Sequence, residues 1–461
     1  MARGSTRRRR RIRARLPGGL LVIAMLLPAS GGVAGVALVT VYPSFSPALG
    51  LAPDLAPAAL EIGDLNGDTR LDVVTANRLG NDVSVFLNAG DGSFLPRRDY
   101  ATSARPDSLA IADVDGDGKP DLVTGSEGDG AGGTVSVLVN SGDGGFSAKR
   151  DYATEATPSS VAAGDVDGDR AEDLVVTMLD EDVSGSGAIA VLRNDGEGAF
   201  VAGQVYPLGA DPASIAIGDL NGDDSADLAT ANTYAGTLSV LLNDGHGAFT
   251  TRRDYATGDW APSVAIGDLN ADGSADLVAG HFDRVVSVFF NRGDGTFEAP
   301  REHQTGRYPN DVAIGDLNGD GAPDLATANY QSNTVSVLAN WGDGSFVARR
   351  DYGTAVDPWS VAIGDLNGDG KPEVAAASED ADEISVLANT TGLCMVPRVH
   401  KKTVAAAKRA IKHGLCRFGG LRLAYSRTIP KGRVLSATPS PGAVLPTGSS
   451  VRLLVSRGPR R

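Results

Sequence analysis

The sequence predicts an all-β fold, a seven-bladed β-propeller closed by an N-terminal strand, followed by a small α+β C-terminal domain. Three observations support this prediction. First, an acidic turn recurs at nearly even intervals, in copies that begin at Asp64, Asp113, Asp165, Asp219, Asp268, Asp316 and Asp365. Second, a phenylalanine precedes every copy at a constant spacing, as Phe346 precedes Asp365. Third, the last repeat stops before its fourth strand, while an unpaired strand precedes the first repeat.

Each repeat unit contains four segments with the composition of β-strands. Within residues 346–389, three segments are rich in Val, Ile, Leu and Ala and are separated by turn residues, namely 360–366, 372–378 and 383–389. A further strand is expected over 346–352, where charged side chains suit an exposed sheet edge. Four strands per unit, repeated seven times, is the pattern of a β-propeller. A stacked solenoid is the alternative.

Phe45 distinguishes these two architectures. It precedes the first acidic turn at the same spacing as the later phenylalanines, in the segment "SFSPALGL", which has the character of a fourth strand without its own repeat. The seventh repeat ends at Asn389 without a fourth strand. A ring can complete its last blade with the N-terminal strand and leave no open edge, whereas a solenoid has no use for this arrangement.

The acidic turn has the ligand pattern of a hard cation. Side-chain oxygens stand at positions 1, 3, 5 and 9, position 7 can add a backbone carbonyl, and Ca²⁺ takes about six to eight oxygens. A metal-free turn rich in Asp, Asn and Gly is the alternative. Seven copies in register favour calcium, with up to seven ions. The predicted ligands are Asp64, Asn66, Asp68 and Asp72; Asp113, Asp115, Asp117 and Asp121; Asp165, Asp167, Asp169 and Asp173; Asp219, Asn221, Asp223 and Asp227; Asp268, Asn270, Asp272 and Asp276; Asp316, Asn318, Asp320 and Asp324; and Asp365, Asn367, Asp369 and Glu373.

Some copies of the turn depart from this pattern. Glycine at position 6 permits a positive φ angle, but Thr69, Arg170 and Asp224 replace it in three copies. We expect these three sites to bind calcium more weakly. Ala271 replaces the glycine at position 4 of the fifth copy, and Glu373 replaces the final Asp of the last copy.

The candidate ligand face is the one opposite the acidic turns. Because antiparallel strands alternate direction, the acidic turns share one face, and the loops between blades share the other. The second face carries the length variation of the repeats and the aromatic residues Trp260, Tyr308 and Trp359. Loops on a rigid scaffold often bind ligands. The alternative is that these aromatic side chains only cover the junctions between blades.

The repeats show no catalytic constellation. His246, His281 and His303 lie in different repeats, and no nucleophile elbow or phosphate-binding loop is present. The sequence therefore predicts a non-catalytic protein.

Charge and hydropathy divide the chain into parts. Residues 1–31 have a basic start, an apolar stretch and small residues after it, which predicts a signal peptide, with an uncleaved membrane anchor as the alternative. Residues 32–44 are expected to be a linker, and 45–390 the propeller. Residues 391–461 carry fifteen Lys and Arg and no Asp or Glu, although the whole chain has a net charge of -15.

The C-terminal segment 391–461 is predicted to be a separate small domain. A basic helix is expected over 403–414, followed by strands and turns. The two cysteines of the chain, Cys394 and Cys416, both lie here. In an exported protein they are expected to form a disulfide, with two free thiols as the alternative.

These motifs resemble two known families. Residues 45–390 resemble the FG-GAP/VCBS repeats of integrin α-subunit propellers, in which the acidic turn joins the first two strands of a blade and binds calcium. That resemblance implies calcium ligation by Asp113, Asp115, Asp117, Asp121 and their counterparts. The segments "MVPRV" and "PSPGAVLPTGS" resemble a PASTA domain, one helix on a three-stranded sheet. That family is associated with peptidoglycan recognition.

Taken together, the sequence predicts an exported, calcium-binding protein that serves recognition or adhesion at the bacterial cell surface. The expected ligand is a protein or a glycan. Peptidoglycan or an anionic wall polymer is expected to bind the basic C-terminal domain. No nucleic-acid partner is expected, and the protein is expected to be a monomer. A polysaccharide-degrading lyase or hydrolase is the alternative function, and a scaffold without a discrete ligand is a third.

Overall fold

The structure is a computed structural model. It describes residues 43–46, 49–128, 132–179, 186–208, 211–258, 260–391, 393–396, 398–413, 416–441, 444–446 and 450–459. All elements belong to the unit Tyr42–Arg461. The predicted signal peptide, residues 1–31, and most of the linker 32–44 lie outside the described residues.

The described part of the repeat region forms seven four-stranded antiparallel sheets. The predicted all-β class and four-stranded repeat are confirmed. The first three sheets contain β2 (Pro57–Gly63), β3 (Asp72–Asn77), β4 (Asp82–Phe86) and β5 (Arg98–Ala101); β6 (Pro106–Ala112), β7 (Asp121–Ser126), β8 (Thr134–Leu138) and β9 (Arg150–Ala153); and β10 (Thr157–Gly164), β11 (Asp173–Leu179), β12 (Gly187–Asn194) and β13 (Phe200–Pro207).

The next three sheets repeat this order. They contain β14 (Pro212–Gly218), β15 (Asp227–Asn232), β16 (Thr237–Asn243) and β17 (Phe249–Ala256); β18 (Val264–Gly267), β19 (Asp276–His281), β20 (Val285–Phe289) and β21 (Arg301–Gln304); and β22 (Pro309–Gly315), β23 (Asp324–Asn329), β24 (Thr334–Leu338) and β25 (Arg350–Gly353), with a short 3₁₀ turn η1 (Tyr330–Ser332) between β23 and β24.

The seventh sheet takes its outer strand from the other end of the repeat region. It contains β26 (Pro358–Gly364), β27 (Glu373–Ser378), the 3₁₀ turn η2 (Glu379–Ala381) and β28 (Glu383–Leu387), and β1 (Leu49–Leu51) pairs with β28. Phe45 bridges to Asn389, as Phe94 bridges to Asn88 in the first sheet. The expected position of Phe45 beside the seventh repeat is therefore confirmed.

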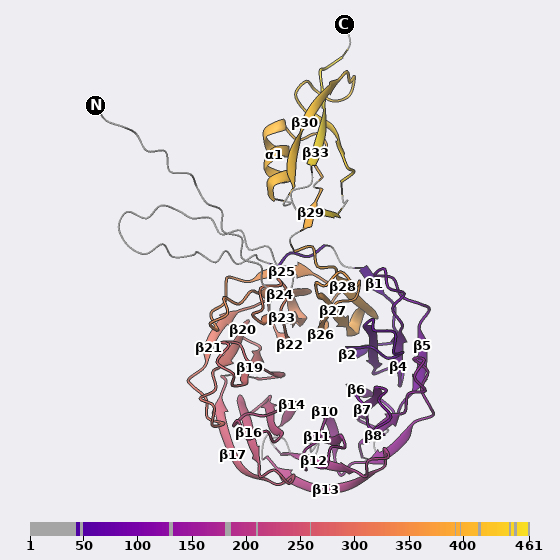
Figure 1. Cartoon of the computed structure of the whole chain (residues 1–461), viewed down its shortest axis with the longest axis vertical. Helices are drawn as coiled ribbons and strands as arrows, with labels where there is room; N and C mark the ends of the chain where they lie inside the picture. The colour runs from indigo at the N-terminus through magenta and orange to yellow at the C-terminus, as the bar shows by residue number, and fades with distance from the viewer. Residues whose placement is uncertain are drawn as a thin grey trace, which may run out of the picture. The chain divides into compact units, whose positions relative to one another are not determined.

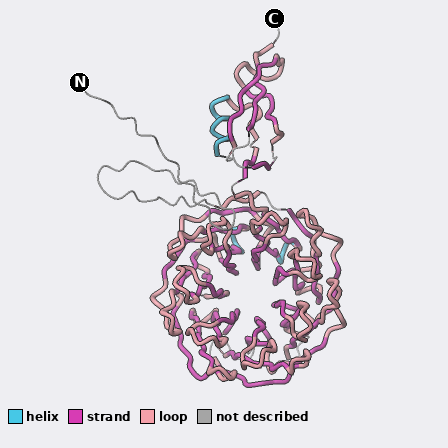
Figure 2. The backbone as a smooth tube through the Cα atoms, in the orientation of Figure 1, coloured by secondary structure: helices cyan, strands magenta, loops and turns pink. Residues whose placement is uncertain are grey.

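The sheets are arranged around a central axis, with their first strands innermost (Figure 1). Neighbouring first strands pack against each other in the order β2, β6, β10, β14, β18, β22 and β26, and β26 also packs against β2. Figure 2 shows that this ring is made almost entirely of strands and loops.

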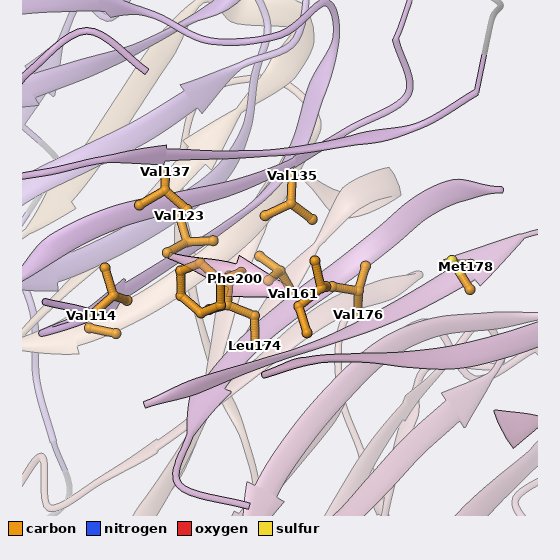
Figure 3. Packing of buried hydrophobic residues seen from close by; sticks show 11 residues of the cluster. Val114, Val123, Val135, Val137, Val161, Leu174, Val176, Met178 and Phe200 are labelled. Carbon is orange, nitrogen blue, oxygen red and sulfur yellow. The ribbon is translucent and has the colours of Figure 1, made fainter. Parts of the chain in front are cut away.

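Burial explains the composition of each strand. The second strand of a sheet is covered on both faces, and every residue of β7 is buried. The outer strands are mostly exposed, as in β9 (Arg150–Ala153). Between the second and third sheets, Val123 and Val137 pack with Leu174, Val176 and Phe200 (Figure 3). Full burial of a Val or Leu side chain contributes about 1.5–3 kcal/mol.

The outer strands are shorter than expected in most sheets. The predicted strand 346–352 begins only at Arg350, while Phe346 makes an isolated bridge to Asn340. The segment before Arg350 stays beside the third strand through the N–H of Val347, which donates to the carbonyl of Ala339 at 2.9 Å, and through the Phe346 bridge, so the pairing there is irregular rather than absent.

The C-terminal domain has the predicted α+β composition. Helix α1 (Val404–His413) accompanies a sheet in the order β30 (Arg417–Ala424), β33 (Ser450–Ser456), β31 (Val434–Thr438). A second pair joins β29 (Leu393–Met395) to β32 (Val444–Pro446). Its core contains Ala407, Ile411, Val434, Val451 and the buried Cys416.

The predicted disulfide between Cys394 and Cys416 stays a prediction, because the Cys394 side chain lies outside the described residues. None of the helices in the described part of the chain has the length and apolar content needed to cross a membrane.

Candidate functional site

The acidic turn joins the first and second strands of each sheet, as expected. In the last copy, Asp365 at position 1 accepts backbone N–H groups from Gly368 at 2.9 Å and Asp369 at 3.2 Å through Oδ1. Its Oδ2 accepts from Gly370 at 2.7 Å. One carboxylate therefore organises the whole turn, and the equivalent bond to position 6 is present in all seven copies.

Positions 3 and 5 present further oxygens on the exposed side of the turn. Asn367 Oδ1 accepts the N–H of Asp369 at 2.9 Å, and Asp369 Oδ1 accepts the N–H of Lys371 at 3.0 Å. Each oxygen has a second lone pair that remains available to a cation. These contacts bring the predicted ligands at positions 1, 3 and 5 together within the turn.

In two turns, three carboxylates converge closely enough to share one ion. The groups are Asp113, Asp115 and Asp117 in the second turn, and Asp165, Asp167 and Asp173 in the third, with ligand atoms within 4.8 Å of one another. Hard oxygen ligands of this kind suit Ca²⁺. The donor set therefore fits the predicted metal.

The acid at position 9 has a second role that the sequence did not indicate. It is buried in every turn: Asp72, Asp121, Asp173, Asp227, Asp276, Asp324 and Glu373. In the second sheet, Asp121 Oδ2 accepts the N–H of Val114 at 3.0 Å, and Oδ1 accepts the N–H of Asn140 at 2.7 Å. Position 9 thus ties the acidic turn to the turn between the third and fourth strands.

Burial also raises the pKa of the acid at position 9. It raises the pKa of Asp121 to about 6 and the pKa of Asp324 and Glu373 to about 7, and the neighbouring turn carboxylates add to the shift. A bound cation would oppose this effect, because it favours the ionised carboxylate. The site is therefore one in which ionised carboxylates need a counter-charge.

The turns that depart from the glycine pattern keep the same backbone. Positions 4 and 6 have positive φ angles in all seven copies, and Thr69 (69°), Arg170 (77°), Asp224 (65°) and Ala271 (59°) adopt them without being glycine. A non-glycine residue is strained in this left-handed region. The departures therefore keep the backbone conformation of the turn at a local conformational cost.

Seven asparagines link neighbouring sheets, and sequence reasoning missed their role. Each stands at the end of the third strand of its sheet, where the side-chain amide donates to the carbonyl of position 2 in the adjacent acidic turn at 2.7–2.8 Å. The available signal was the Asn that recurs before the Gly-Asp-Gly motif. The set is Asn88, Asn140, Asn194, Asn243, Asn291, Asn340 and Asn389.

The opposite face carries the three predicted aromatic residues and joins two of them through further rings. Trp260 contacts Tyr234 and Phe282, with ring centroids 4.5 and 4.7 Å apart, and Phe282 contacts Tyr308 at 4.2 Å. We call Tyr234, Trp260, Phe282 and Tyr308 the aromatic run. Trp359 lies in β26 and instead pairs with Tyr330 at 5.6 Å.

Two known protein families match different parts of the chain. The FG-GAP-like repeat model matches residues 64–124, 113–176, 219–279, 268–327 and 316–376. The chain belongs to the FG-GAP-like repeat family. A PASTA domain matches residues 395–457. No curated protein shows significant sequence similarity to the chain.

Two similar solved structures, with TM-scores above 0.5, share the fold of the repeat region at low sequence identity. The crystal structure of BBS1N in complex with ARL6DN, soaked with mercury, has a TM-score of 0.53 and 14% identity, covering 76% of this chain and 98% of that chain. The lead-soaked form has a TM-score of 0.51 and 13% identity, covering 74% and 96%. A lectin from Agrocybe aegerita that recognises non-reducing terminal N-acetylglucosamine has a TM-score of 0.48 and 22% identity, covering 70% and 86%.

The FG-GAP ring also encloses a central cavity of about 430 Å³, lined by the first strands. Three of its carboxyl groups belong to Glu61, Asp107 and Asp311. Burial raises the pKa of Glu61 to about 7, and the nearby Asp311 adds to the shift. The sequence did not single out these acids, because nothing in it shows that three distant repeats meet at one axis.

Two of the cavity acids already have partners in neighbouring blades. Asp311 accepts hydrogen bonds from Ser360 Oγ at 3.0 Å and from the N–H of Val361 at 2.9 Å. Asp107 pairs with Arg78 Nε at 3.0 Å. Burial nevertheless raises the pKa of Asp107 to about 7, with Arg78 opposing the shift. These contacts give both acids a structural role between blades.

Proposed function

We propose that this protein is an exported, calcium-binding propeller of seven blades, closed by its N-terminal strand, that serves non-catalytic recognition or adhesion at the bacterial cell surface. The observation that carries the proposal is the convergence of Asp113, Asp115 and Asp117 within 4.8 Å in a turn that recurs around the ring. Such carboxylates repel one another without a counter-charge, so a calcium ion in each turn would stabilise the ring.

The proposed role of calcium is architectural. Extracellular calcium sites have dissociation constants of about 10⁻⁴–10⁻³ M. At free calcium about ten times the dissociation constant, one site adds about 1.4 kcal/mol to the free energy of unfolding. Up to seven occupied sites would then add roughly 10 kcal/mol, which is comparable to the whole stability of a typical domain.

The PASTA domain supports association with the cell wall. Its segment 391–461 has fifteen basic residues and no acidic one, so peptidoglycan or an anionic wall polymer is the proposed partner. A disulfide between Cys394 and Cys416 would constrain this small domain. The protein is proposed to act as a monomer, in which the face of the ring opposite the acidic turns engages a protein or a glycan.

The proposal is tested by retention of the purified full-length protein on isolated cell walls, with calcium or with EDTA, at low and high salt. We expect calcium-dependent retention that falls with salt, because screening weakens attraction between exposed charges. Retention that depends on neither calcium nor salt concentration would overturn the proposed roles of the acidic turns and of the basic domain.

A polysaccharide-degrading enzyme is the second candidate, and the cavity acids are the observation that favours it. A carboxyl group with a pKa of about 7, such as Glu61, has the protonation behaviour of a general acid. Asp107 and Asp311, however, are engaged by Arg78, Ser360 and Val361. Release of new reducing ends from a wall polysaccharide, abolished by Glu61→Gln, would favour this candidate over binding alone.

A further inference from the structure

We propose that the aromatic run binds a neutral, linear glycan whose pyranose rings carry equatorial hydroxyl groups, such as a β-1,4-linked chain. This inference rests on the proposed recognition function and names the ligand class of that site. Tyr234, Trp260, Phe282 and Tyr308 come from loops of three successive sheets, yet their rings contact one another in series. The run therefore crosses two blade junctions as one continuous aromatic surface.

The first two members of this run are open to solvent. Tyr234 is 61% exposed and Trp260 is 39% exposed. Phe282 and Tyr308 are partly buried beside them. Core packing thus accounts for part of the run and leaves two large rings available to a ligand.

Backbone geometry points in the same direction. Trp260 and Tyr308 have positive φ angles of 44° and 53° at the position that leads into the first strand of a sheet. Ala56, Arg105 and Asp357 adopt the same conformation at this position in other sheets. The fold therefore sets the direction of this residue, while the side chain varies from one blade to the next.

Bulky residues are disfavoured in this conformation, at about 1–3 kcal/mol. In the fifth sheet this conformational cost applies to Trp260. Its ring stays partly exposed, so burial of the side chain does not fully offset the cost. Because five sheets share this conformation and the ring is not fully buried, neither the backbone nor core packing requires an aromatic ring there, and a ligand-binding role would account for it.

The chemistry around the run favours a sugar over an apolar protein or a lipid. In the described loops of these three sheets on this face, the exposed large apolar side chains are Tyr234 and Trp260. The exposed aliphatic residues of the face, Leu55, Leu79 and Val356, belong to other sheets. A surface for lipid or for an apolar helix would be expected to use aliphatic side chains as well.

Exposed polar side chains accompany the rings. Asp283 and Arg284 follow Phe282, and Arg307 precedes Tyr308. A pyranose with equatorial hydroxyls presents C–H groups on its faces, which suit the negative face of an aromatic ring, and directs its hydroxyls sideways toward hydrogen-bonding groups. The mixture of one acidic and two basic side chains suits a neutral chain better than a strongly charged one.

The test uses the full-length protein in calcium, with cellohexaose and chitohexaose as probes and a β-1,4-mannohexaose as the axial-hydroxyl control. Binding is measured by calorimetry and by tryptophan fluorescence. We expect the two equatorial hexaoses to bind, and Trp260→Ala and Tyr234→Ala each to weaken binding by about tenfold or more. Trp341→Ala, which removes a 49% exposed ring from the acidic-turn face, is the matched control and should leave binding unchanged.

Two outcomes would overturn the inference: neither equatorial hexaose binds, or both aromatic variants bind like the wild type while their melting temperatures are unaltered. Failure of the inference can be told apart from failure of the proposed function. Calcium-dependent retention on cell walls without binding of either equatorial hexaose would support the proposed function and exclude this glycan site. Hexaose binding should also withstand high salt, because it does not depend on exposed charge.

Discussion

The side-chain amide of Asn88 donates a hydrogen bond of 2.7 Å to the carbonyl of Leu366, which lies in the seventh repeat. The same amide donates at 2.8 Å to Leu71 in its own sheet. Leu366 is position 2 of the last acidic turn. This contact joins the first sheet to the seventh, and the same pair of bonds recurs at each of the other junctions.

Replacement of one of these asparagines should lower stability. Asn291→Ala leaves the buried carbonyl of Leu220 and the partly buried carbonyl of Ala275 without this donor. We expect a loss of about 2–4 kcal/mol in the free energy of unfolding, since each unsatisfied buried group costs about 1–3 kcal/mol. Denaturant unfolding measures it. Asn88→Ala should cost a similar amount, and a negligible effect at both positions would contradict this role.

Calcium should raise the melting temperature, and chelation should lower it. Asp113→Ala removes the position-1 carboxylate of a turn in which three acids converge, so it should reduce the calcium-dependent part of the stability by about 1–2 kcal/mol. Asp143→Asn, in the nearby Gly-Asp-Gly turn, is the control and should keep the full calcium response. A melt that EDTA does not alter would exclude structural calcium.

Relief of backbone strain in the first turn should stabilise the protein. Thr69 is exposed and has a φ angle of 69°. Thr69→Gly should therefore add about 0.5–1 kcal/mol, because glycine adopts this conformation freely but loses more entropy on folding. Thermal melting checks this result. Thr69→Ala, which keeps the positive φ without glycine, should bring little gain, and an equal gain would show that strain is not the cause.

Glu61 should make stability depend on pH. Its pKa is raised from 4.5 to about 7 in the folded state, so its stabilising effect is complete below pH 4.5 and is lost as pH rises through 7. Glu61→Gln should consequently be more stable than the wild type at about pH 8, by on the order of 1–3 kcal/mol, and equal to it near pH 4. Chemical unfolding at the two pH values, with the exposed Glu155→Gln as control, measures this difference.

Much of the architecture follows from local patterns. The constant spacing from Phe45 to Asp64, and from each later phenylalanine to its turn, predicted the repeated sheet. The acids of Asp365 to Glu373 predicted a turn with converging oxygens, and the structure shows such convergence of carboxylates in the second and third turns. Such features are readable because turn residues and strand composition act over a few neighbouring positions.

Contacts between repeats could not be read in the same way. Asn88 and Leu366 meet only because the first and seventh sheets are neighbours, and Glu61 meets Asp311 only at the central axis. The ring contacts of Trp260 likewise depend on loops from adjacent sheets.

The sequence by itself determined the repeat, the four-stranded unit, the acidic turns and the separate basic domain, because these depend on spacing and composition. Tertiary structure decided that position 9 is a buried link to an asparagine, that Thr69 keeps a glycine-like backbone, and that Tyr234 and Phe282 extend the surface around Trp260. The physical reason is the same in each case: burial and contact are set by residues brought together from different sheets, while spacing is set within one repeat.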